Sequence, residues 1–430
     1  MSRYRVIIVL FLIALVGALS TGRGLFWAFA GSLLMLIVVP IVWAWTGVNW
    51  LRISRRTFSR VAQVGQHLEE EFRLTNLSWL PKLWIEVRDQ SNLPNHYASR
   101  VVGLVGGKQW RGWRTRTLCE QRGRFSLGPI LVRSGDPLGI YQMQKRIHNV
   151  TTLLVYPATY AFRDFPLPAT FMPGGDALRR RTHYVTTNAA GVRDYTTGDS
   201  INRIHWPSSV RRQRLIVKEF ELDPMSDVWI AVDLYEGAHI HPLLSDELEE
   251  IEQSATPTSP TASTAPTASE SSPAFTLPAD SEEYTISIAA SAAQHFLQQG
   301  RVVGLIAYGK HRELVAAERG ERQHTKIMET LAVVRAHGEI PFERVLSSEA
   351  FLLPRNASLI AISASPDVAW AAAVQQATRS GLRVVAIVID VQSFGAEGVT
   401  CEPVVAALAE SGAIVRIVRF GDSIPAAIEQ

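Results

Sequence analysis

Two apolar runs open the chain. Val6–Ser20 carries no charged residue, and neither does Leu25–Trp50. A helix needs about 20 apolar residues to cross the hydrocarbon core of a bilayer. The second run is long enough by itself, the first becomes long enough with its flanks, and the link Thr21-Gly22-Arg23-Gly24 suits a tight turn. The pattern therefore predicts a transmembrane helical hairpin over residues 1–50.

A secretory signal peptide is the alternative for the first run, but a second apolar run follows at once and no small-x-small cleavage site is present. Lys and Arg collect on the cytoplasmic side of membrane proteins. Only Arg23 lies in the turn, whereas arginines at positions 3, 5, 52, 55, 56 and 60 flank the hairpin. We therefore expect an N-terminus and soluble domains that face the cytoplasm, with Trp43, Trp45 and Trp50 at the inner interface.

Short segments with alternating apolar and polar residues follow, from residue 51 to residue 157. Pro, Gly, Asn or Asp separates them at intervals of roughly 8–15 residues, which is typical of an all-β sandwich. Irregular extensions around a larger core are the alternative. The expected strands are Glu70–Asn76, Leu83–Arg88, Ser99–Val105, Arg114–Cys119, Gly123–Leu127, Ile130–Ser134 and Thr152–Tyr156.

A different alternation begins at residue 227, where continuous apolar strands alternate with helices. This pattern indicates a doubly wound α/β domain over residues 227–430, with a mostly parallel sheet covered on both faces. The expected strands are Asp227–Asp233, Arg301–Tyr308, Ser358–Ser363, Leu382–Ile389 and Ile414–Val418. The expected helices are Glu282–Gln299, Lys326–Arg335, Asp367–Ser380 and Cys401–Ser411.

Two further segments lack this regularity. Residues 158–226 connect the β-rich region to the α/β domain. Inside the α/β domain, residues 254–281 are rich in Ser, Thr, Pro and Ala. Such a segment buries too little apolar surface to offset its ordering entropy, so we expect a disordered surface insertion. A phosphorylated or docking segment is the functional alternative.

Asp233 ends the first α/β strand, at the sheet edge where ligands bind in such folds. The order of strands and helices resembles a von Willebrand factor A domain, which carries Asp-x-Ser-x-Ser there and binds a divalent cation through these oxygens. Here Tyr235 and Gly237 replace the two hydroxyl residues, although Ser363 and Asp367 offer oxygens at a neighbouring strand end. We expect a degenerate site without metal; a metal-dependent adhesion module that uses Asp233 is an alternative.

Composition narrows the function classes further. The formal net charge of the 430 residues is only +3, and acidic residues directly follow the arginine-rich stretches, which argues against a nucleic-acid partner. No P-loop, GxGxxG, HExxH or CxxC pattern is present, so we expect no cofactor, no bound metal and no small-molecule substrate. Cys119 and Cys401 lie far apart, as suits a reducing cytoplasm. His239 and His241 are interpreted as part of a solvated loop rather than as a metal-binding pair.

His205 lies three and four residues before Ser208 and Ser209, and Asp199 precedes all three. A nucleophile, a base and an orienting carboxylate form a hydrolytic triad only when they meet in space. A membrane-associated hydrolase that uses Asp199, His205 and Ser208 or Ser209 is therefore an alternative. Our main interpretation is that the chain is not an enzyme.

The segment Gly191–Phe220 holds five arginines, a Gly-Asp turn and a tryptophan within thirty residues. It resembles the signature of the domain of unknown function 58 family. The segments Arg122–Pro129 and Asp136–Ile140 likewise resemble the R-G-x-Y/F-x-L-G-P and D-P-F-G-L segments of this family. The signature residues that we expect to act in structure or interaction are Arg193, Tyr195, Gly198, Asp199, Arg203, Trp206 and Arg211.

This resemblance implies a fold and a context. Members of the family look like a membrane hairpin followed by a β-sandwich, the signature and a von Willebrand A-like domain. Their genes commonly lie beside a gene for a MoxR-type AAA+ ATPase. The resemblance thus implies a scaffold or adaptor protein in the bacterial inner membrane, which works with such an ATPase in the assembly or maturation of other proteins.

Two interpretations of the signature stay open at this point. Gly198 and Asp199 suit a turn, Trp206 offers a large ring for burial, and arginine makes planar bidentate contacts. A structural latch between the β-rich and α/β domains accounts for these residues. A contact surface for a protein partner accounts for them as well, and the two roles can coexist.

Overall fold

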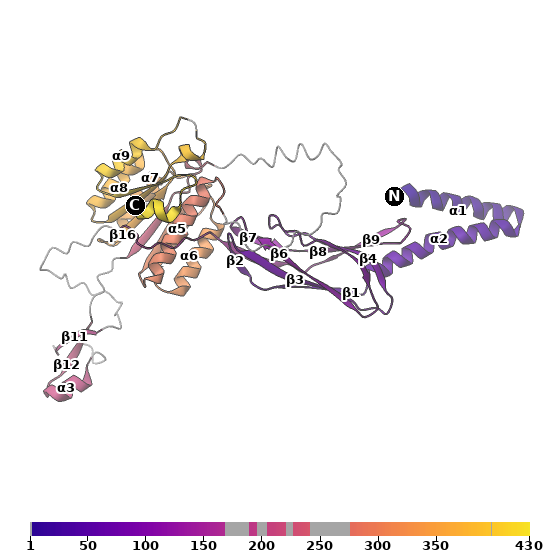
Figure 1. Ribbon diagram of the computed structural model, residues 1–430, viewed down its shortest axis with the longest axis horizontal. Coiled ribbons are helices and arrows are strands. Elements are labelled where there is room, and N and C mark those ends of the chain that lie inside the picture. Colours follow the sequence, from indigo (N-terminus) through magenta and orange to yellow (C-terminus); the bar gives the residue numbers. More distant parts are fainter. Residues whose placement is uncertain (1, 168–188, 196–203, 221–226, 241–275, 397) are drawn as a thin grey trace.

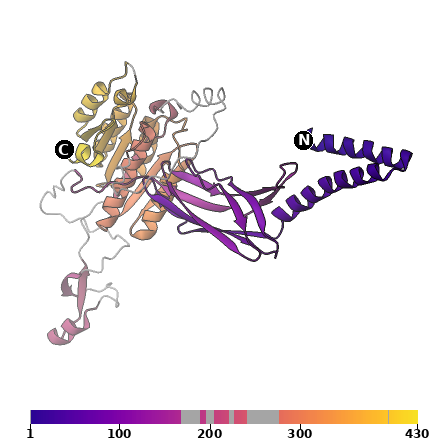
Figure 2. The ribbon, with the colours of Figure 1, turned by 45° about the vertical axis from the view of Figure 1, so that its right-hand side comes forward.

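The computed structural model describes residues 2–167, 189–195, 204–220, 227–240, 276–396 and 398–430 (Figure 1). Three parts follow one another along an elongated molecule. A pair of apolar helices lies at one end, a β-rich region lies in the middle, and a layered α/β region lies at the other end (Figure 2). The chain is thus a mixed α/β protein with several sheets and an apolar N-terminal helix.

The helix pair consists of α1 (Ser2–Thr21) and α2 (Gly24–Val48). They lie side by side (Figure 1) and are joined at Gly22, whose φ of 65° is costly for a residue with a Cβ. Helix α2 has 25 residues, and a stretch of 18 of them has a mean hydropathy of 2.5, so by length and composition it is able to cross a membrane. In α1 the apolar stretch Arg5–Thr21 is shorter than a full span. Among the described helices, α2 alone meets the criteria for a span.

Two antiparallel sheets form most of the β-rich region. Their strand orders are β1-β3-β6 and β5-β4-β8-β9. Every second residue of β3 from Leu68 to Asn76 is buried, as the alternation of a strand with one covered face requires. Side chains from both sheets, including Phe72, Ile85, Trp113 and Val132, meet in one buried cluster. The strands are β1 (Leu51–Thr57), β3 (His67–Asn76), β4 (Lys82–Asp89), β5 (Arg100–Val105), β6 (Trp110–Leu118), β8 (Ile130–Gly135) and β9 (Gln142–Ile147).

A third sheet carries the β-rich region over to the α/β region. It has the order β2-β10-β7, formed by Val61–Gln63, Thr151–Tyr156 and Gly123–Leu127. Leu127, Leu153 and Val155 of this sheet belong to the same buried cluster as the first strand and first helix of the α/β region. The two regions therefore share a continuous apolar core.

All seven strands expected between residues 51 and 157 are present as β3 to β8 and β10, within a few residues of the predicted limits. Strands β1, β2 and β9 are not predicted by the pattern. Strand β1 carries three arginines, and no residue of β9 is buried, so neither shows a clear apolar face. Their partners in the sheet hold them in place through backbone hydrogen bonds.

The α/β region contains a six-stranded sheet of order β15-β14-β13-β16-β17-β18, parallel except for the edge strand β15. Side chains of α5, α6 and α10 cover one face, and those of α7, α8 and α9 cover the other. The strands are β13 (Val228–Val232), β14 (Val303–Tyr308), β15 (Arg312–Glu318), β16 (Ser358–Ser363), β17 (Arg383–Ile389) and β18 (Ile414–Val418). The helices are α5 (Ser281–Gln298), α6 (Glu321–Val333), α7 (Phe342–Glu349), α8 (Ala369–Arg379), α9 (Glu402–Glu410) and α10 (Ile424–Glu429).

Every strand and helix expected after residue 227 is present, whereas β15, α7 and α10 are not predicted. Most of the predicted insertion at 254–281 lies outside the described residues. Its last part is ordered, because Leu277 is buried and Ser281 is the first residue of α5. The Asp280 side chain caps this helix by accepting a hydrogen bond from Glu282 N at 2.8 Å.

Helix α2 is attached firmly to the β-rich region. A Cβ placed on Gly47 would lie 2.4 Å from Ser134 Oγ of β8, so the helix approaches the strand as closely as glycine allows. The Lys82 ammonium donates hydrogen bonds to the carbonyl oxygens of Thr46 and Asn49, the latter at 2.7 Å. Burial lowers the pKa of Lys82 to about 8. This lysine satisfies two carbonyls at the end of α2 that the helix itself leaves open.

Candidate functional site

The described part of the signature forms a small unit of its own. Strand β11 (Ala189–Asp194) pairs antiparallel with β12 (Ile216–Phe220), and α3 (Trp206–Arg212) lies between them in sequence. Tyr195 N donates to Leu215 O at 2.9 Å and His205 N donates to Ile216 O at 2.8 Å, which closes the unit. In both views it lies apart from the β-rich and α/β regions (Figures 1 and 2). The interpretation of the signature as a latch between these regions stays a prediction, because Gly198, Asp199 and Arg203 lie outside the described residues.

Ser209 holds α3 against β12. It is buried, its hydroxyl accepts a hydrogen bond from Ile216 N at 2.9 Å, and it donates to His205 O at 3.0 Å. Buried Ile216 and Val217 complete this small core. The last residues of the signature thus form strand β12.

The outer face of α3 carries apolar and basic side chains together. Trp206 is 58% exposed and Val210 is 75% exposed, so the expectation that the tryptophan ring is buried is wrong. Arg211 and Arg212 at the end of the helix are exposed as well. An exposed tryptophan beside arginines is the composition that concentrates binding energy in protein interfaces.

The remaining signature residues are only partly placed. Arg193 lies in β11 opposite Val217, and Tyr195 is half-buried. Gly198, Asp199 and Arg203 lie outside the described residues. The role in structure or interaction that we expect for the signature residues thus stays a prediction.

The proposed hydrolytic residues meet in part. His205 Nδ1 lies 2.7 Å from Ser208 Oγ, which is hydrogen-bond distance for a base and a nucleophile. Ser209 is engaged in the structural contacts given above and is not available for this role. Asp199 lies outside the described residues, so the third member of the triad is not placed.

Asp233 lies where it was predicted, after β13 at the carboxyl edge of the sheet, and it is 1% exposed. Ser363 Oγ at the end of β16 donates to Asp233 Oδ2 at 2.6 Å, and Tyr235 N donates to Oδ1 at 3.0 Å. Burial raises the pKa of Asp233, although nearby His239 and these hydrogen bonds oppose the shift. Both carboxylate oxygens are occupied by donors of the protein.

These contacts do not suit a hard divalent cation, which needs six or more oxygen ligands. Asp367 Oδ1 accepts from Ala369 N at 2.9 Å at the start of α8 and is committed there. Among the described residues no group of three His, Cys, Asp or Glu side chains comes together. His239 is buried, with Nε2 2.9 Å from Asp233 O, so its interpretation as a solvated residue is wrong; His241 lies outside the described residues.

Sequence reasoning missed the residue that joins the two soluble regions. Arg122, at the start of β7, is fully buried between α5 and α6. Its guanidinium forms ion pairs with Glu282 and Glu283 and donates from Nε to Leu331 O at 3.1 Å. In return Arg335 donates to Arg122 O at 2.8 Å. In the sequence, the one indication that Arg122 matters was its place at the start of the segment Arg122–Pro129, which resembles a segment of the family.

The fold and the signature unit define a mixed α/β protein with an apolar N-terminal helix and a small separate arginine-rich unit. A family model described as "Protein of unknown function DUF58" matches residues 191–241, which include the signature segment, and this match supports the assignment to that family. The chain is 23% identical over 229 residues to "Uncharacterized protein YeaD" of Bacillus subtilis (strain 168). That match spans 53% of this chain and 47% of the relative, so the chain covers about half the length of the protein it matches.

Solved structures show weak overall likeness. The conserved hypothetical protein BatB from Bacteroides thetaiotaomicron superposes with a TM-score of 0.31 at 13% identity, over 48% of this chain and 96% of that one. The CARDB domain of PF1109 from Pyrococcus furiosus gives a TM-score of 0.20 at 18% identity, over 25% of this chain and 90% of that one. Both scores lie below 0.5, so neither likeness carries a functional argument.

Proposed function

We propose that this protein is a membrane-anchored adaptor that binds a protein partner through its signature unit. The observation that carries the proposal is the exposed face of α3, where Trp206 is 58% and Val210 is 75% exposed beside two exposed arginines. Exposed apolar side chains that form a patch with a polar rim mark sites of protein–protein contact.

The architecture supports an adaptor. We propose two membrane-spanning helices at residues 1–50 with a cytoplasmic N-terminus, a β-sandwich at 51–157, a connecting region at 158–226 and a von Willebrand A-like domain at 227–430. If β13 is counted as strand 1, the order of the sheet is 3-2-1-4-5-6, the doubly wound order, and its switch point lies between β13 and β16. Asp233 and Ser363 end these two strands and bond to each other, which leaves a closed edge in place of a ligand site.

We further propose, on the family resemblance, that the partner is a MoxR-type AAA+ ATPase in the bacterial inner membrane. The test is cross-linking of the full chain in intact membranes, with and without Trp206→Ser and Val210→Ser. We expect both variants to reduce the cross-linked ATPase at least about tenfold, since removal of an interface anchor typically costs 2 kcal/mol or more.

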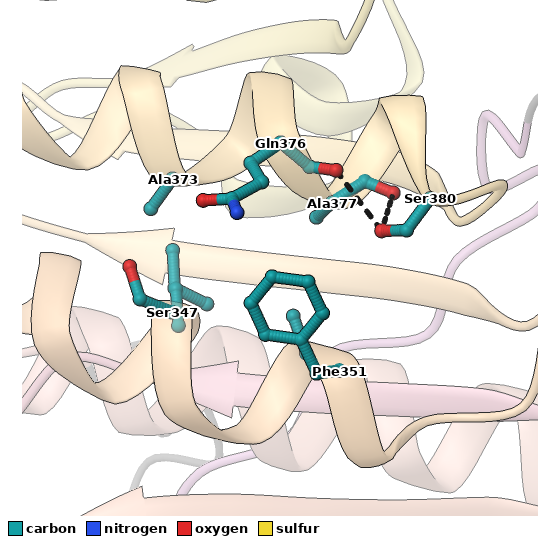
Figure 3. A pocket seen from close by; sticks show the side chains of 8 residues that line it. Ser347, Phe351, Ala373, Gln376, Ala377 and Ser380 are labelled. Atoms are coloured by element: carbon teal, nitrogen blue, oxygen red, sulfur yellow. Dashed lines mark hydrogen bonds between the residues drawn. The ribbon is translucent and has the colours of Figure 1, made fainter.

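The matched control is Phe351→Ser. Phe351 is 59% exposed and borders a shallow groove between α7 and α8 (Figure 3), far from the signature in sequence. Capture by the control together with loss of capture by the α3 variants supports the proposal. Full capture by α3 variants that melt normally overturns it, and loss of capture by Phe351→Ser alone would move the docking site to the groove.

A hydrolase is the second candidate, favoured by the distance of 2.7 Å between His205 Nδ1 and Ser208 Oγ. A serine activated by histidine reacts with a fluorophosphonate probe at the hydroxyl. Labelling of Ser208 that disappears in His205→Ala would support this candidate. Absence of labelling, together with normal complementation of a deletion strain by His205→Ala, would exclude it.

A further inference from the structure

The turn between β8 and β9 reaches along the outside of α2. Pro137 and Leu138 at its tip line an apolar hollow of about 210 Å³ together with Val39, Pro40 and Trp43 of the helix. Trp43 and Val39 lie five and nine residues before Val48, the end of α2. At 1.5 Å per residue the tip therefore lies roughly 8–14 Å before the helix ends.

The polar groups of this turn are bonded within the turn. Asp136 is only 3% exposed, and its carboxylate accepts hydrogen bonds from Leu138 N at 2.9 Å and Tyr141 N at 2.5 Å. Asp136 N donates to Tyr141 O, and Gly139 N donates to Asp136 O, both at 3.1 Å. Pro137 has no N–H to satisfy. Backbone that enters lipid needs such internal partners, because no water is present there.

The side chain at the tip faces outward. Leu138 is 62% exposed, and it follows Pro137, which is exposed as well. An apolar tip with internally bonded polar groups, held beside an apolar helix, is suited to the acyl chains that surround this helix.

A second loop of the β-rich region lies level with the end of α2. Leu77 N donates to Trp50 O at 2.8 Å, which places residues 77–80 beside the last turn of the helix. Trp79 is 78% exposed, Leu77 is 48% exposed and Leu80 is 40% exposed. Tryptophan is enriched at the headgroup level of membranes because its ring is apolar with one polar N–H.

The charge beside residues 77–80 has one sign. No Asp or Glu occurs between Phe72 and Ile85 or between Arg100 and Leu118. The basic residues of these stretches at the strand ends nearest the loop are Arg73, Lys82, Lys108 and Arg111. Basic residues next to a membrane span attract anionic headgroups.

We propose that residues 77–80 and 136–141 form a lipid-binding end of the β-rich region. Leu138 inserts at the boundary between headgroups and acyl chains, Trp79 lies at the headgroups, and the surrounding basic residues favour anionic phospholipid. The proposal rests on the membrane anchor of the proposed function and is independent of the partner at the signature unit. Its consequence is a fixed orientation of the soluble regions toward the bilayer, beyond what a flexible tether provides.

The test uses the full chain in vesicles of phosphatidylcholine, with or without phosphatidylglycerol. The two native cysteines are buried and are replaced by alanine, and single cysteines carry a nitroxide label. The labelled variants are Leu138→Cys, Trp79→Cys, Met35→Cys within α2, and Val150→Cys. Val150 is the matched control, because it is 55% exposed and follows β9 at the end of the hairpin opposite the turn.

Oxygen, which dissolves in lipid, should relax the labels at positions 35 and 138 more strongly than a water-soluble nickel chelate does. The nickel chelate should dominate at position 150. Position 79 should become less accessible to nickel when phosphatidylglycerol is present, and Lys108→Glu with Arg111→Glu should remove this difference.

Three outcomes contradict the proposal in distinguishable ways. If nickel reaches positions 138 and 150 equally while position 35 lies in lipid, the turn does not bind lipid. The proposed membrane anchor is then still supported. Nickel access at position 35 overturns the anchor and the lipid-binding end together. Shielding of position 138 from both reagents shows that protein, not lipid, covers the turn, and it also overturns the proposal. Loss of partner capture by the signature variants changes none of these accessibility results, because the two experiments test different surfaces.

Discussion

Arg122 of the β-rich region and Glu283 of the α/β region form a buried ion pair, with 2.5 Å between Nη1 and Oε1. The same guanidinium contacts Glu282, and Nη2 donates to Val334 O at 3.1 Å. Burial alone would raise the pKa of Glu282, but Arg122 and Arg335 hold it below its ordinary value. The contact between the two regions is thus made by a fully buried guanidinium and two carboxylates that are at most 10% exposed.

Replacement of Arg122 by methionine should separate the two regions. Two carboxylates are then left buried without their main partner, and loss of one member of a buried ion pair costs about 3–5 kcal/mol. We expect a marked fall in the thermal unfolding temperature and faster proteolysis between the regions. Arg124→Met is the control, since Arg124 is exposed two residues away. Equal melting of the two variants would contradict the role of Arg122.

A second buried charge cluster lies inside the β-rich region. Side chains of Arg55, Glu70, Asp89 and His96 are at most 2% exposed. Arg55 Nε lies 3.0 Å from Glu70 Oε1, and His96 Nε2 lies 3.0 Å from Asp89 Oδ2. Two carboxylates face one arginine, so a protonated histidine makes the cluster neutral.

This cluster should make stability depend on pH. Burial alone would lower the pKa of His96, but Asp89 and Glu70 raise it above its ordinary value of 6.5. Burial alone would raise the pKa of Asp89, but His96, Ser91 and Arg55 lower it below 3.8. The contribution of His96 to folding stability is complete below pH 6.5 and is lost as pH rises through the raised pKa. The aspartate contribution is complete above pH 3.8 and is lost as pH falls through the lowered pKa.

We therefore expect the cluster to contribute most between about pH 4 and pH 6.5. The thermal unfolding temperature, measured from this range up to alkaline pH, should decline above about pH 6.5, and His96→Gln should abolish that decline. The control is His67→Gln, because His67 is exposed at the start of β3. Identical pH profiles for wild type and His96→Gln would show that the histidine does not titrate with folding.

Asp233 should behave as a structural hydrogen-bond acceptor. Its raised pKa means that ionisation costs stability, so its contribution is complete below pH 3.8 and declines as pH rises through the folded-state pKa. Asp233→Asn keeps an acceptor for Tyr235 N and should melt at least as high as wild type at neutral pH. Asp233→Ala leaves Ser363 and Tyr235 without a partner and should cost about 1–3 kcal/mol.

Calorimetry with Mg²⁺ provides the independent readout for this site. Binding that Asp233→Ala abolishes, with the variant still folded, would restore the metal-dependent adhesion module. We expect wild type and Asp233→Asn to give the same heats of dilution.

The contact between α2 and β8 should depend on Gly47. A valine there meets Ser134 Oγ and Cβ, which lie 2.4 and 2.9 Å from the position of a Cβ. Overpacking of this kind costs about 1–3 kcal/mol, so Gly47→Val should lower the melting temperature in detergent and expose the segment around Asn49 to protease. Gly31→Val in the same helix is the control, since nothing lies within 4 Å of a Cβ at that position. Similar losses in both variants would attribute the effect to helix propensity.

Much of the local structure follows from periodicity in the sequence. The buried strands of the α/β region are continuous apolar runs, and β3 alternates strictly, so their positions were predictable from the chain itself. The strands that escaped prediction, β1, β2, β9 and β15, are all edge strands with few buried side chains. No residue of β15 is fully buried, and backbone bonds to β14 hold it in place. Helix α7 was missed because its eight residues are too few to show a clear period.

The sequence by itself determined the resemblance to the family, through the residues of the signature, and the location of Asp233 at the end of a buried strand. It did not determine which arginine joins the regions, because partners such as Arg122 and Glu283 are far apart in sequence and every arginine looks alike in a pattern. It also suggested burial for Trp206, which the structure leaves 58% exposed. Tertiary structure decided these points, since burial and charge pairing depend on which distant segments meet and not on local composition.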